Sequence, residues 1–131
     1  MSYDLYFWRQ TKACEASPDE LLDFLSLNQP VEGIATFPRE RILQVLRKAF
    51  PDIDDGDFEL TWEGAGSYFQ ISFGHANEKQ VHLIAANCGY ELLKCPEAVN
   101  RLIEACEQLG CALYDPQEGK RYDQPEPTPT D

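Results

Sequence analysis

Hydrophobic and polar residues alternate with a period of two in several stretches of this chain. In residues 2–9, Tyr3, Leu5 and Phe7 fall on one face and the residues between them fall on the other. The same alternation recurs at 57–64 and 67–74, and the apolar stretches 80–86 and 111–115 are read as a fourth strand and a short closing strand. A period of two with aromatic and β-branched residues is typical of β-strands. The glycines between the second and third stretches predict an antiparallel hairpin there.

Three other stretches repeat their apolar residues at the spacing of a helical turn. The first follows Ser17, a good N-cap residue, and Glu20 completes an S-x-x-E capping box. The second covers residues 38–50. The third covers 95–110, where Gly110 stands at the position after the helix that favours glycine.

These elements follow one another in the order β-α-α-β-β-β-α-β. That order favours the α+β class, with a mainly antiparallel sheet of about four to five strands and three helices that cover one of its faces. We expect a single domain over residues 1–123 and a loose, proline-rich tail over 124–131. The segment 87–94 has no clear pattern.

Acidic residues outnumber basic ones by 23 to 11 in the 131 residues, which gives a formal net charge of −12. A chain with this charge should repel nucleic acids and anionic membranes. If it binds a macromolecule, we therefore expect a basic protein.

Further features argue for a cytoplasmic protein without a metal or cofactor. The N-terminus lacks the pattern of a signal peptide, and no apolar run is long enough to span a bilayer. The five cysteines form no C-x-x-C pair, and with two histidines they show no zinc spacing. Free thiols in a reducing cytosol are the expected state.

Four aspartates crowd the short stretch PDIDDGD at residues 51–57. An EF-hand calcium loop needs its glycine one position later and its glutamate six residues beyond that glycine, whereas here Glu63 lies seven beyond Gly56. We therefore expect a polar turn and no metal site.

A long acidic segment surrounds that turn. No Lys or Arg occurs between Ala49 and Glu78, a stretch that holds seven acidic residues. We expect a continuous negative surface, here called the acidic ridge, made of Asp52, Asp54, Asp55, Asp57, Glu59 and Glu63. Such a run is either a solvated face or a surface that attracts a basic partner. The basic residues Arg39 and Arg41 either pair with nearby acids or bind carboxylates of a partner.

Aromatic residues share the outward strand faces with some of these acids. Tyr6, Trp8 and Tyr68 fall on the same face as His82, and Tyr and Trp beside charges are typical of binding hot spots. The face is either an open interaction surface or one covered by other elements.

Motifs of catalysis are absent from the sequence. There is no G-x-S-x-G, no phosphate-binding loop and no dinucleotide fingerprint. The one catalytic arrangement to consider is a pair of His82 with one of the cysteines. Nothing in the surrounding sequence indicates that such a pair is catalytic. We predict no catalytic residues.

The opening MSYDLYFW and the later LGCALYDPQEGKRY, with its Tyr114, Asp115, Pro116, Gln117 and Gly119, resemble the ends of small bacterial cytosolic proteins. Some of these are immunity proteins that accompany secreted or contact-dependent toxins. The resemblance covers about a fifth of the chain. It implies a non-enzymatic inhibitor that binds a cognate toxin domain.

We therefore expect an immunity-type binding protein for a basic toxin domain, a class that includes nucleases. Its expected binding residues are those of the acidic ridge with Tyr6, Trp8 and Tyr68. The alternatives are a homodimeric regulatory or interaction module unrelated to toxins, and a small enzyme that uses a cysteine with His82.

Overall fold

The computed structural model describes residues 2–12, 15–56, 59–64, 66–94, 96–117 and 120–121. Its helices are α1 (Pro18–Ser26), α2 (Arg39–Ala49) and α3 (Pro96–Glu107), with a short 3₁₀ helix over Tyr90–Lys94. Its strands are β1 (Ser2–Trp8), β2 (Phe37–Pro38), β3 (Asp54–Asp55), β4 (Leu60–Gly64), β5 (Ser67–His75), β6 (Gln80–Gly89), β7 (Ala112–Asp115) and β8 (Lys120–Arg121). This is the α+β class that the sequence predicts. The predicted tail, 124–131, lies outside the described residues.

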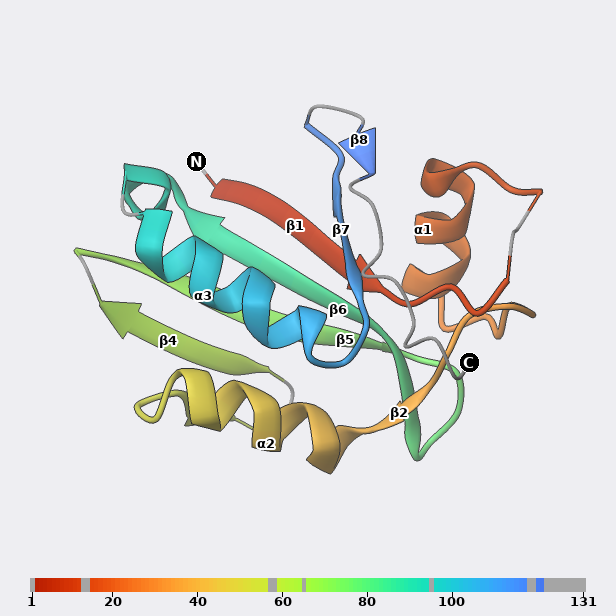
Figure 1. The fold of residues 1–131 in the computed structure, drawn as a ribbon, viewed down its shortest axis with the longest axis horizontal. Coiled ribbons are helices and arrows are strands. Elements are labelled where there is room, and N and C mark those ends of the chain that lie inside the picture. The colour runs from red at the N-terminus through yellow and green to blue at the C-terminus, as the bar shows by residue number, and fades with distance from the viewer. Residues whose placement is uncertain are drawn as a thin grey trace.

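The strands form one antiparallel sheet in the order β3-β4-β5-β6-β1-β7-β8, and β2 pairs with one end of β6 (Figure 1). The five longer strands are those that the sequence predicts. The other three strands contain two residues each, and a periodic pattern cannot be recognised in so short a segment. The predicted β4–β5 hairpin is confirmed, with Gly64 opposite Ser67 across its turn.

The main core lies between the sheet and the pair α2 and α3, which cross one face of it (Figure 1). Ile42 and Leu46 of α2 are fully buried there, as the helical spacing predicts. Phe50, Trp62 and Phe69 pack together with ring centroids 4.9 to 5.3 Å apart. Large aromatic rings in contact stabilise such a core beyond their buried area.

The expectation that three helices cover one face is wrong, because α1 lies on the opposite face. Its buried residues Leu21 and Leu25 pack with Trp8, Leu83 and Tyr114 in a second, smaller core. Those three strand residues alternate with residues of the main core, so they point away from it. Their apolar area needs its own cover, and α1 supplies it at one end of the sheet (Figure 1).

The ends of α1 follow from its sequence and from a glycine beneath it. The Ser17 hydroxyl accepts a hydrogen bond from the backbone N–H of Glu20, and the Glu20 carboxylate accepts one from the N–H of Ser17, which confirms the capping box. A Cβ at Gly74 would lie 2.5 Å from the Leu25 carbonyl oxygen. A glycine in β5 therefore lets the end of the helix lie directly on the sheet.

Candidate functional site

The helix α1 covers only one end of its sheet face, and the rest of that face is the candidate site. We call this part the open face. Each of its side chains is exposed or partly exposed, and the residues are Asp4, Tyr6, Asp54, Thr61, Glu63, Tyr68, Gln70, Ser72, Ala85 and Asn87. Side chains alternate between the two faces along each strand, and the strand pairing sets residues of the same face opposite one another. Neighbours of the buried core residues therefore gather on this face.

A polar row crosses the middle of the open face. Asp54, Thr61, Gln70, Asn87 and Asp4 lie opposite one another in five successive strands. The Asn87 side-chain amide donates a hydrogen bond of 2.6 Å to the Asp4 carboxylate. Such a row gives a flat surface rich in hydrogen-bonding groups, unlike the apolar strip beneath α1.

Glu63 and Tyr68 form a cross-strand pair near the turn of the β4–β5 hairpin. The Tyr68 side chain is 38% exposed. Its ring lies against Gly89 of β6, where an added Cβ would be 3.1 Å from the ring atom Cε1. Glycine at that position lets the aromatic ring lie across the neighbouring strand.

The open face meets the second core at Tyr6. This residue lies opposite Ala85 on one side and Tyr114 on the other, and it is half-buried. Burial, together with the charge of Asp4, raises the pKa of the Tyr6 hydroxyl above its ordinary value. Like an ordinary tyrosine, the group is protonated at neutral pH and can donate a hydrogen bond.

The acidic ridge is interrupted at Asp55. Asp54, Glu59 and Glu63 are exposed, and so is Asp52 in the turn before β3. The Asp55 carboxylate turns toward α2, where its two oxygens lie 2.8 Å from an Arg39 nitrogen and 3.1 Å from an Arg47 nitrogen. The alternative in which a helix arginine pairs with a nearby acid thus holds for Arg39. Asp57 lies outside the described residues.

The stretch PDIDDGD contains the first strand of a small hairpin. Ile53 is buried, and Asp54 and Asp55 pair with Thr61 and Leu60 of β4. The Gly56 N–H donates to the Glu59 carbonyl oxygen at 2.9 Å. The predicted turn therefore accounts for only part of this stretch, since two of its residues form a strand. Alternation along that strand places Asp54 and Asp55 on opposite faces of the sheet.

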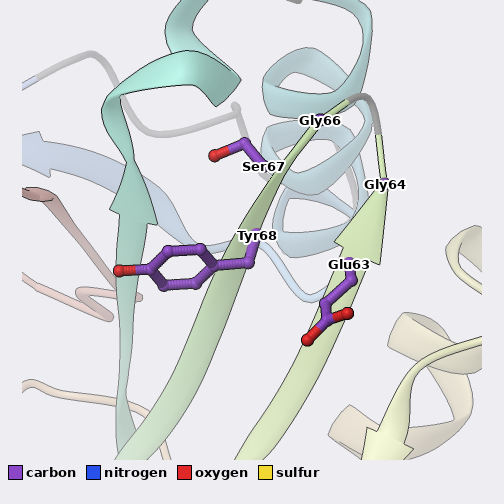
Figure 2. A pocket seen from close by; sticks show the side chains of 5 residues that line it. All are labelled: Glu63, Gly64, Gly66, Ser67 and Tyr68. Carbon is purple, nitrogen blue, oxygen red and sulfur yellow. The ribbon is translucent and has the colours of Figure 1, made fainter.

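A shallow hollow of about 520 Å³ lies at the turn of the β4–β5 hairpin. Its lining consists of Glu63, Gly64, Gly66, Ser67 and Tyr68 (Figure 2). Figure 2 shows the Tyr68 ring directed toward β6 and the Glu63 carboxylate on the adjacent strand. The two glycines leave backbone exposed between these side chains.

Trp8 and His82 are not part of an accessible surface, so the expectation that they belong to one is wrong. Trp8 is 1% exposed and His82 is 3% exposed, both beneath α1. The His82 Nε2 lies 2.9 Å from the Leu25 carbonyl oxygen at the end of that helix. His82 is also the extra residue of a β-bulge, because Gly74 pairs with Leu83 and His75 pairs with Val81.

The described cysteines Cys88, Cys106 and Cys111 are buried. Burial raises the pKa of Cys88 to about 12 and raises that of Cys106 well above its ordinary value. Reactive cysteines instead have lowered pKa values and partial exposure. These three thiols pack as small apolar groups.

Sequence reasoning missed a polar cluster that joins the two ends of the described chain. The Gln117 side chain donates to the Asp4 carbonyl oxygen at 2.8 Å and accepts from the Asp4 N–H at 2.9 Å, as a neighbouring strand would. Asp115 accepts hydrogen bonds from the Tyr3 hydroxyl and from the Gln117 backbone. The Y-D-P-Q segment was visible in the sequence, but its partner Asp4 was not.

A scan against protein-family models finds no match, and searches of curated proteins and of solved structures find no significant similarity. Among the described residues, no helix has the length and apolar character needed to cross a membrane. In the same part of the chain, no three His, Cys, Asp or Glu side chains are grouped as a metal site would require.

Proposed function

We propose that this protein is a non-enzymatic binding protein that recognises a basic protein domain through its open face. The observation that best supports this proposal is the set of residues that make up that face. It combines the carboxylates of Asp4, Asp54 and Glu63 with Tyr6 and Tyr68, and strands β3 to β6 and β1 contribute no Lys or Arg to it. Following the sequence resemblance, we propose that it is a bacterial immunity protein that acts in the cytosol on a toxin domain.

The physical case rests on charge and on aromatic contact area. A surface of one sign, on a chain with a net charge of −12, attracts a basic partner and speeds its association. Exposed tyrosines supply contact area at low cost in conformational entropy, which suits the centre of an interface. Fast association suits an inhibitor that acts before damage accumulates.

A second copy of the same chain is a less favourable occupant of this face. Two open faces brought together would place like charges from Asp54 and Glu63 in one interface. Such juxtaposition costs several kcal/mol when it is not compensated. The charge therefore favours a basic partner over a homodimer.

The test uses the toxin domain that the adjacent upstream gene would encode, purified with this protein after co-expression. A variant with Asp54→Asn and Glu63→Gln should associate roughly three- to tenfold more slowly at low salt, with a flatter dependence on ionic strength. The matched control changes Glu97→Gln and Glu104→Gln, two exposed acids of α3 on the other side of the sheet. Equal association rates for both variants would exclude the open face as the binding surface.

A further inference from the structure

We propose that the hollow at the β4–β5 hairpin is a subsite for a guanidinium group, which an arginine side chain of the partner occupies. This inference rests on the proposed function, since it takes the arginine to belong to the basic partner. Three features of the hairpin carry it: the placement of Tyr68, the exposed carboxylate of Glu63, and the backbone of two glycines in the turn.

The Tyr68 ring offers a flat surface to a planar cation. It lies against Gly89, where no side chain intervenes, and 38% of the residue remains exposed. A guanidinium stacks on such a ring through cation–π attraction and apolar contact. The contact with β6 keeps the ring flat on the sheet, so an approaching group meets its face.

Glu63 places a carboxylate on the strand next to Tyr68, while the Tyr68 ring is directed toward β6 on the other side (Figure 2). It lies directly opposite Tyr68 in the hairpin, and opposite residues in an antiparallel pair have Cβ atoms about 4.5–5.5 Å apart. Glu63 is exposed and forms no ion pair with another described residue. A guanidinium that stacks on Tyr68 can therefore donate two parallel hydrogen bonds to this carboxylate.

Two glycines form the part of the turn that lines the hollow next to these side chains. A Cβ at Gly64 would lie 2.6 Å from the Trp62 ring, so a larger residue there would disturb the main core. Gly66 has a φ of +76°, a conformation that favours glycine. The turn is thus held bare for structural reasons, and the hollow that results admits a planar group of this size (Figure 2).

Arginine fits these features better than lysine does. Its fork of N–H groups matches one carboxylate while its plane stacks on a ring, whereas an ammonium is a compact and strongly hydrated charge. A neutral side chain of the same shape would stack on Tyr68 but would leave the Glu63 charge without compensation.

The test is a titration of the intact protein with N-acetylarginine N-methylamide, followed by the amide resonances of the hairpin. The matched probe is the citrulline analogue, which has the same shape without the charge. We expect the arginine probe to shift resonances around residues 63–68 and the citrulline probe to bind at least threefold more weakly. Glu63→Gln and Tyr68→Ala should each weaken arginine binding about two- to fivefold, whereas Tyr68→Phe and the remote Glu97→Gln should change it less than twofold.

Equal affinities for both probes, or an arginine affinity that is unchanged in Glu63→Gln, would overturn the subsite. The same resonances show that each variant is folded, so a loss of binding is distinguished from a loss of structure. If the arginine probe does not bind while the charge variants still slow association with the toxin domain, only the subsite is excluded. If the probe binds while those variants leave the association rate with the toxin domain unchanged, only the proposed function is excluded.

Discussion

Trp8 and His82 show how one residue's environment depends on elements distant in the sequence. Both point away from the main core, Trp8 through strand alternation and His82 as the extra residue of the β-bulge, and both are buried beneath α1. Alternation assigns a residue to a face, but it does not reveal whether another element covers that face. The same holds for Tyr114, whose hydroxyl donates to the Asp19 carboxylate of α1, a bond that raises the pKa of Tyr114 to about 12.

His82 should make folding stability depend on pH in a recognisable direction. Burial lowers its pKa below the ordinary 6.5, against the opposing effect of the hydrogen bond to Leu25. Below pH 6.5 the unfolded chain therefore binds a proton before the folded protein does. Stability contributed by neutral His82 is fully present above that pH and is lost as the pH falls toward the folded value.

Urea unfolding between about pH 5.5 and 7.5 measures this dependence. Replacement of His82→Gln should flatten the slope of the unfolding free energy in that range. Replacement of His75→Gln, whose side chain is more exposed, should leave most of the slope in place. A slope that disappears only with His75→Gln would contradict the account.

At the scale of elements, α1 has the most consequences for the face it covers. Its inward residues Leu21 and Leu25 close the second core, while Phe24 and Leu27 remain 40% and 68% exposed. The helix is short, and its stability comes mainly from tertiary packing and from its capping box. Docking of α1 therefore sets the boundary between the covered and the open parts of the face.

Truncation of Leu25→Ala should destabilise the protein by about 2–5 kcal/mol, because it leaves a cavity between α1 and Trp8. The same change at the exposed Leu27 should cost less than about 0.5 kcal/mol. Chemical unfolding measures both values, and tryptophan fluorescence reports the environment of Trp8. Similar losses in the two variants would mean that α1 does not pack as described.

The sequence predicts the long elements well because periodicity and caps are local signals. Ser17, Glu20 and Gly110 occupy the expected positions at helix ends. The ion pairs of the Asp55 side chain could not be predicted, since the face on which it lies depends on the pairing of β3 with β4 and its partners are arginines of α2. The composition of the open face likewise depends on register among five strands, which alternation within each strand does not specify.

At the scale of the whole molecule, Arg39, Arg47 and Arg101 lie on the side of the sheet that carries α2 and α3. Arg39 and Arg47 bind Asp55, and Arg101 lies over the Phe50 ring at 4.9 Å. On the open face, Asp54 and Glu63 form no ion pair with any residue that the structure describes. This division leaves one face suited to a basic partner, and it makes that face rather than the helical side the expected interface.

The most direct measurement compares partner affinity after one bulky cation is placed on each side of the molecule. Ser72 is exposed in the middle of the open face, and Gln108 is exposed just beyond the end of α3. Ser72→Arg should weaken binding of the toxin domain by at least about a hundredfold, through steric and like-charge conflict in the interface. Gln108→Arg adds the same charge elsewhere and should change the affinity less than about threefold. Equal affinities for the two variants, or a larger loss for Gln108→Arg, would contradict the assignment of the open face.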